Sequence, residues 1–141
     1  MITLALAAQM TDAAVSRAAE LGAVVSAAVV DAGGHLVHFQ RMDSAEIAGP
    51  TLAVDKAFTA VAHRIDTAEL TALAAPGGAL AGLEANGSGR YVVFGGGLPC
   101  WARDRVAAGI GVSGGTTEQD VACARAALTV WESRTGAPSA G

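Results

Sequence analysis

The sequence predicts a fold of the α+β class, with helices near both ends and strands between them. Apolar residues recur at helical spacing over 4–21 and again after residue 116, and a pair of glycines separates two extended runs. A chain of 141 residues is short for two domains, so we expect one domain over 1–141. Apolar residues make up 52% and charged residues 16%, a composition that predicts a packed core.

The first helix is predicted over 4–21, capped by Thr3 and ended by Gly22. A β-hairpin is predicted next, with strands over 24–32 and 35–41 and a two-residue turn at Gly33 and Gly34. This turn sets the register, so the expected cross-strand pairs are Ala32–His35, Val30–Val37 and Ala28–Phe39.

Asp31 and His38 become diagonal neighbours on the more polar side of this hairpin. A carboxylate in that position can fix the tautomer of an imidazole and make the two an acid–base pair. An ordinary exposed pair is the alternative.

A helix from Pro50 to about His63 is predicted in the middle of the chain, with its apolar stripe formed by Val54, Ala57, Phe58 and Val61. Lys56, Thr59 and His63 share the opposite face, where a cation, a hydroxyl and an imidazole could orient an anionic substrate. A solvated outer face explains these three residues equally well. Asp66 and Glu69 resemble a capping box for a short helix that stops before Pro76.

Three more strands are predicted over 91–94, 98–102 and 106–112, the last two joined by a tight turn near Arg103 and Asp104. Thr116 and Gln119 form a capping box that opens a final helix. We expect the tail after Arg134 to fray.

Glycine-rich segments at 95–97 and 113–115 allow the backbone to approach a ligand closely. The second segment precedes a helix N-terminus, whose free N–H groups favour a carboxylate or phosphate. We therefore expect three separated glycine-rich segments, these two among them, to frame a shared pocket beside Lys56. The predicted ligand-binding residues there are Gly96, Gly97, Ser113, Gly114, Gly115 and Thr116. Simple turns and bulges are the alternative.

Net charge, apolar runs and cysteine spacing indicate which partners and which location to expect. A net charge of −4 disfavours nucleic acid, and no apolar run approaches the ~18 residues of a membrane span, so we expect a cytoplasmic protein. The low charged fraction favours a homo-oligomer. Cys100 and Cys123 match no metal-site or redox spacing, so we expect free thiols and no metal site.

Four segments carry a resemblance to a known family: VVDAGGHLVHFQRMDSAEIAGPTLAVDKAFTA at 29–60, APGGALAGLE at 75–84, FGGGLP at 94–99 and GIGVSGGTTEQD at 109–120. They resemble the GlcG/HbpS family, which includes the C-terminal domain of PduO-type proteins. The resemblance implies a three-layer α-β-α domain with an antiparallel sheet of about five strands. It also implies a homo-oligomer, from dimer to octamer, and haem or another tetrapyrrole as a candidate ligand.

In the haem-binding members of this family, a histidine near the start of the domain is associated with the iron. The predicted first helix contains no histidine. The side chains that could replace it are the imidazoles of His35, His38 and His63 and the thioethers of Met10 and Met42. Arg41, in the family-like stretch FQRMD, either ties down the chain after the second strand or grips a ligand carboxylate.

Two functions remain open from the sequence. One is a small-ligand-binding protein that holds a planar or anionic molecule, such as a tetrapyrrole, at the glycine-rich loops. The other is a cofactor-free isomerase, lyase or hydrolase that acts by proton transfer on a small carboxylate-bearing substrate. Its acid and base would come from Lys56, His63 or the pair Asp31 and His38.

Overall fold

A computed structural model describes residues 1–136, so the expected fraying of the tail lies mostly outside the described residues. The elements follow in the order α1 (Leu4–Leu21), β1 (Ser26–Asp31), β2 (Leu36–Arg41), α2 (Ala48–His63), α3 (Thr67–Ala74), β3 (Gly97–Ala102), β4 (Arg105–Ser113) and α4 (Thr117–Thr135). Two 3-10 turns, Leu83–Ala85 and Gly87–Gly89, lie between α3 and β3.

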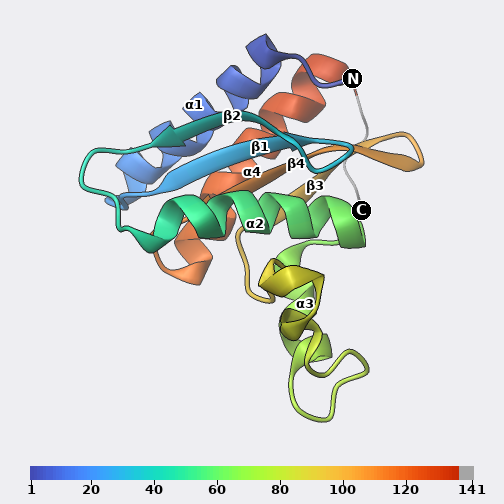
Figure 1. The fold of residues 1–141 in the computed structure, drawn as a ribbon. Helices are drawn as coiled ribbons and strands as arrows, with labels where there is room; N and C mark the ends of the chain where they lie inside the picture. Colours follow the sequence, from blue (N-terminus) through green and yellow to red (C-terminus); the bar gives the residue numbers. More distant parts are fainter. Residues whose placement is uncertain (137–141) are drawn as a thin grey trace.

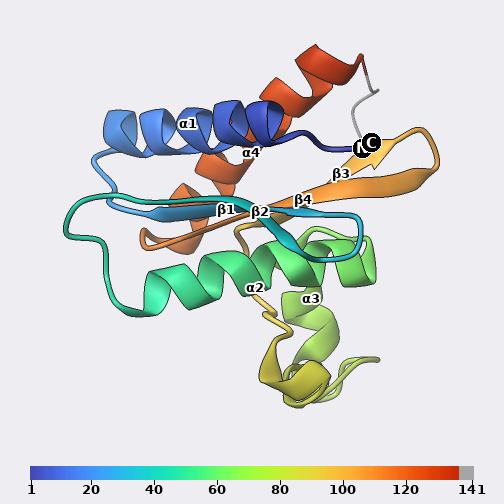
Figure 2. The same ribbon diagram turned by 45° about the horizontal axis from the view of Figure 1, so that its top comes forward.

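The elements form three layers, as expected. The four strands pair antiparallel in the order β2-β1-β4-β3. Helices α1 and α4 cover one face of this sheet and α2 covers the other (Figures 1 and 2). The α+β class is therefore confirmed, with a main core between the sheet and the α1–α4 pair.

The sheet has four strands rather than about five, because residues 91–94 do not form the predicted strand. Their backbone bonds threonine side chains of the neighbouring helices instead. The Val92 N–H donates to Thr59 Oγ1 over 3.0 Å, and Thr71 Oγ1 donates to the Val93 carbonyl over 2.7 Å. The excursion from α3 to residue 90 projects away from the layers (Figure 1).

Helix α2 lies directly on β4 because β4 carries glycine at the contact. A Cβ atom at Gly111 would overlap the Ala53 carbonyl, and one at Gly109 would come within 2.7 Å of the Ala57 carbonyl. Such a surface accepts only a small-residue face of a helix. The buried face of α2 accordingly shares only Ala57 with the predicted stripe: it contains Gly49, Ala53, Lys56, Ala57, Thr59 and Ala60.

The β1–β2 hairpin differs from its predicted register at the turn. The Asp31 N–H donates to the His35 carbonyl, and the Gly34 N–H donates to the Asp31 carbonyl, which closes a three-residue loop with Gly34 in the left-handed region. The pair Ala28–Phe39 is as predicted, whereas Val30 pairs with Leu36. The predicted pairs Val30–Val37 and Ala32–His35 are therefore wrong.

Val37 is the extra residue of a β-bulge, since the register shifts between Val29 and Val30. A bulge breaks the alternation of side chains along a strand. Val37 packs against the core of the α1–α4 layer, and the next residue, His38, bonds Thr11 of α1. Both side chains therefore face α1.

Candidate functional site

Lys56 and Asp120 form a buried ion pair at the end of the sheet. Lys56 extends from α2 and its Nζ lies 3.1 Å from Oδ2 of Asp120 on α4, with side-chain exposures of 1% and 5%. The ammonium also donates to the Val112 carbonyl over 2.9 Å and lies 5.1 Å from the centre of the Phe94 ring. The two glycine-rich segments surround this pair: Gly115 N–H donates to Asp120 Oδ1 over 2.9 Å, and a Cβ at Gly96 would lie 2.7 Å from Nζ.

Burial acts on both charges of the pair. It lowers the pKa of the Lys56 ammonium, and the facing Asp120 carboxylate opposes that change. Burial raises the pKa of the Asp120 carboxyl, which Lys56 and the N–H groups of Gly115 and Gly114 oppose. Additional hydrogen bonds help a buried ion pair to offset the cost of desolvation, and here the Val112 carbonyl and the Gly115 N–H provide them.

The alternative of a solvated outer face on α2 is therefore wrong for Lys56 and Thr59, which are fully buried. The segments 95–97 and 113–115 do converge on Lys56, but the chain's own ammonium and carboxylate lie between them. Gly96, Gly97, Gly114 and Gly115 allow close contact with α2, α4 and the chain before β1.

The N-terminus of α4 is also occupied by its own residues. Thr116 and Gln119 form the predicted capping box, with bonds of 2.9 and 3.1 Å between side chain and backbone. Ser113 ends β4 and is buried. The donors that were expected to bind an anion are thus largely used by Gln119 and Asp120.

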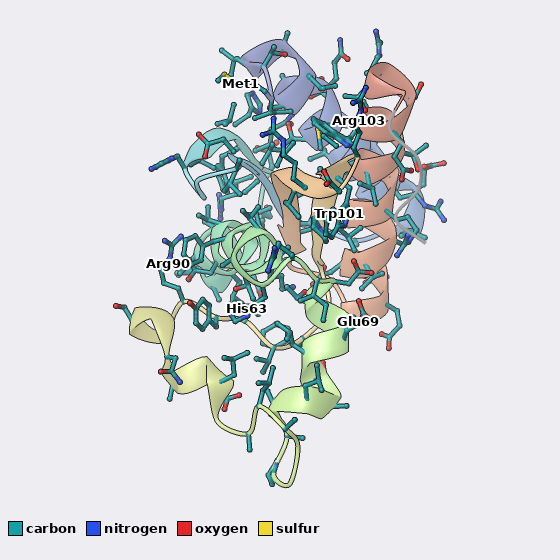
Figure 3. All side chains as sticks on the ribbon, turned by 90° about the vertical axis from the view of Figure 1, so that its right-hand side faces the viewer. Met1, His63, Glu69, Arg90, Trp101 and Arg103 are labelled. Carbon is teal, nitrogen blue, oxygen red and sulfur yellow. The ribbon has the colours of Figure 1, made fainter. Side chains whose placement is uncertain are left out.

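Thr59 and His63 hold the segment that follows the 3-10 turns. Thr59 Oγ1 donates to the Asp55 carbonyl and accepts from Val92 N–H. The His63 ring meets the Tyr91 ring at 4.5 Å in an edge-to-face contact, and its Nε2 is buried without a hydrogen bond. Figure 3 shows His63 and Arg90 on the side of α2 that faces this segment.

The predicted pair of Asp31 and His38 does not form. Asp31 Oδ1 accepts from Gly33 N–H and His35 N–H, each over 2.9 Å, and lies 3.2 Å from His35 Nδ1. These backbone N–H groups, first that of His35, hold the pKa of Asp31 below its usual range. The three-residue loop brings His35 rather than His38 to this carboxylate.

His38 instead belongs to a cluster with α1. Its Nδ1 lies 2.9 Å from Thr11 Oγ1, and Gln40 Nε2 donates to the same oxygen over 2.9 Å and also to Asp12. Arg41 donates to the Ala45 carbonyl, which agrees with the expected role of tying down the chain after the second strand.

A hollow of about 330 Å³ lies at the end of the molecule where the β1–β2 and β3–β4 turns meet the N-terminus. Its walls are mostly apolar and come from Met1, Ile2, Asp31, Ala32, Gly33, Val37, Arg105, Val106 and Ala107. Figure 3 shows Met1 and Arg103, in the β3–β4 turn, at this same end. The sequence predicted a pocket beside Lys56. Because Lys56 does not line this hollow, the location of the hollow was not predicted.

Residues 1–136 contain no cluster of metal-binding side chains and no helix long and apolar enough to cross a membrane. Cys100 and Cys123 are free and buried, as expected, and burial raises the pKa of both thiols, that of Cys123 to about 11.

Asp120, Thr11 and Gln40 were not predicted as site residues. Asp120 is the last residue of the family-like segment 109–120, and its place there was the signal that could have identified it as a site residue. Thr11 and Gln40 gave no signal, because a polar residue on an amphipathic helix or strand is ordinary.

Comparisons with known proteins agree with this architecture. The chain is 42% identical, over 90% of its length and 89% of the relative, to an uncharacterized 15.0 kDa protein from the dhaT-dhaS intergenic region of Citrobacter freundii. It is 43% identical to the corrinoid adenosyltransferase PduO of the same organism, over 90% of this chain but only 38% of PduO.

Two solved structures have the same fold. The protein ORFY of Klebsiella pneumoniae has a TM-score of 0.90 and 40% identity, covering 93% of this chain and 90% of ORFY. A PduOC–haem complex has a TM-score of 0.88 and 40% identity, covering 92% of this chain and 94% of PduOC. The family described as haem degrading protein HbpS-like matches residues 2–129. The chain therefore belongs to the HbpS-like family.

Proposed function

We propose that this protein binds haem or another planar tetrapyrrole. The observation that carries the proposal is its 40% identity, over 92% of the chain, to PduOC, which was crystallised as a haem complex. Membership of the HbpS-like family supports it.

The residues of this chain fit such a ligand. Haem iron takes an imidazole as axial ligand, and its ring takes apolar surface. His35 and His38 each have a polar partner at Nδ1 and none at Nε2 among residues 1–136. The thioethers are less available, because Met10 is fully buried and Met42 Sδ accepts from Val25 N–H.

Groups that could serve as acid and base for proton transfer are not assembled into one site. Lys56 bonds Asp120, Asp31 bonds His35, His38 bonds Thr11, and His63 packs on Tyr91. The geometry therefore supports ligand binding better than the alternative enzyme.

A haemin titration followed by absorbance tests the proposal. We expect a shifted Soret band that saturates at a fixed number of haems per chain. Iron-free protoporphyrin, followed by fluorescence, separates binding of the ring from ligation of the iron. Absence of saturation with both compounds would reject the proposal.

The expectations of one domain over 1–141, a cytoplasmic location and a homo-oligomer between dimer and octamer stay predictions. Native mass spectrometry of the purified protein gives the number of chains and any ligand that remains bound.

A further inference from the structure

We propose that His38 is the axial ligand of the haem iron and that Thr11 positions it. This assignment rests on the proposed function and names the residue that carries it. It follows from the hydrogen bonds at Thr11, the β-bulge at Val37 and the apolar surface beside them.

The hydrogen bonds at Thr11 define the tautomer of His38. A threonine hydroxyl has one hydrogen to donate and two lone pairs. Thr11 Oγ1 has three partners: the Ala8 carbonyl at 3.1 Å, Gln40 Nε2 at 2.9 Å and His38 Nδ1 at 2.9 Å. The carbonyl can only accept and the amide nitrogen can only donate. All three contacts are hydrogen bonds only if His38 Nδ1 carries a proton and donates to Thr11.

With its proton on Nδ1, neutral His38 has its lone pair on Nε2. This nitrogen is the atom that binds iron when a partner holds the other ring N–H, as in metal sites where outer residues orient a histidine. Within residues 1–136, the side-chain N and O atoms that are both buried and without a hydrogen bond are Ser26 Oγ and His63 Nε2. His38 Nε2 has no hydrogen bond and is not one of these buried atoms, so it is open to solvent.

The bulge places His38 beside apolar surface. Val37 and His38 both face α1, and Val37 is also a wall of the 330 Å³ hollow. The contacts His38–Thr11 and Gln40–Asp12 show that β2 and α1 run in the same direction. Leu4 therefore lies toward the same end as the hollow, whose walls include Met1 and Ile2, and it is 62% exposed. Leu36 lies on the other face of the sheet, since it pairs with Val30, which packs beside Gly109 under α2. The apolar walls of the hollow, which include Val37 next to His38 in the chain, fit a flat apolar ligand.

The other two histidines are less suited. The His35 side chain is 82% exposed next to the hairpin loop, so it gives a haem ring little buried surface. His63 Nε2 is buried against the Tyr91 segment, so a ligand would first have to displace that segment. His38 is half-buried between two elements and still open at Nε2.

The test compares His38→Leu with the matched control His35→Leu, both titrated with haemin. We expect the wild-type Soret and electron paramagnetic resonance spectra to persist in His35→Leu and to be lost in His38→Leu. Free imidazole added to His38→Ala should restore the wild-type spectrum. An unchanged spectrum in His38→Leu would overturn the assignment while leaving haem binding intact. Failure of the wild type itself to bind would instead reject the proposed function.

Thr11→Val and Thr11→Ser test the positioning role. Loss of the hydroxyl should lower haemin affinity by about 10-fold and broaden the spectrum, because the ligating ring loses the hydrogen bond that orients it, whereas serine should preserve both. Nitrogen-15 NMR of the haem-free protein reads the tautomer directly, so it does not depend on ligand binding. Folding of each variant is checked by circular dichroism. A proton found on Nε2 of neutral His38 would overturn the role of Thr11.

Discussion

Lys56 on α2 and Asp120 on α4 lie 3.1 Å apart and join the helix layers on the two sides of the sheet. The bond passes the ends of β3 and β4, where Gly96 and Gly115 make room for it. The pair is almost completely buried, so its integrity should govern stability rather than ligand access.

Lys56→Met should destabilise the fold by about 3–5 kcal/mol, because it leaves the Asp120 carboxylate buried without its cation. Asp120→Leu should cost a similar amount. The double variant should be more stable than the sum of the single changes predicts, since no charge remains unpaired. Urea unfolding of the four proteins measures this cycle, and simple additivity would contradict the coupling.

Gly96→Ala should destabilise the protein by at least about 2 kcal/mol, because the backbone has φ +129° and the new Cβ would lie 2.5 Å from the Val112 carbonyl. Gly77→Ala is the matched control, with φ +85° but nothing within 4 Å. Thermal unfolding compares the two. Equal losses would show that conformation alone, and not contact with the ion pair, makes glycine necessary at 96.

Asp31→Asn should weaken the protein at neutral pH and flatten the acid limb of its stability profile. The pKa of Asp31 is lowered in the folded state, so the charged carboxylate stabilises the fold above its unfolded pKa. This contribution disappears as the pH falls through the lower, folded pKa. Urea unfolding between pH 7 and pH 2 measures it, with Asp43→Asn as the control. Parallel curves for Asp31→Asn and wild type would contradict the prediction.

Arg105→Gln should weaken haemin binding without changing its Soret spectrum. Arg105 lines the hollow and forms no ion pair within residues 1–136, so its guanidinium is available to a ligand carboxylate. Arg103→Gln, in the same turn, serves as the control. The dimethyl ester of haemin should bind Arg105→Gln and wild type equally. A loss of affinity that persists with this ester would exclude the carboxylate contact.

Local patterns predicted most elements of this fold. Thr3 and Gly22 bound α1, Thr116 and Gln119 cap α4, and the turn at Arg103 and Asp104 joins β3 to β4. The predicted length of the hairpin loop was wrong by one residue. A pair of glycines fits both a two-residue loop and a three-residue loop that ends in a left-handed glycine. Because the loop has one residue more than predicted, the Asp31 carboxylate meets His35 instead of His38.

By itself, the sequence determined the α+β class, the caps of α1 and α4 and the family, since these depend on residues within a few positions of one another or on whole segments. It did not determine every helix start, since α2 begins at Ala48 rather than Pro50 and Asp66 forms no side-chain cap bond at α3. Only the tertiary structure decided that Lys56 is buried, because its partner Asp120 lies 64 residues away. It also decided that His38 contacts Thr11, 27 residues earlier, while its Nε2 has no partner within residues 1–136. Glycines on β4 accept the small residues of α2, and Gly96 and Gly97 leave room for Lys56 beside them. No periodicity along α2 alone contains that information.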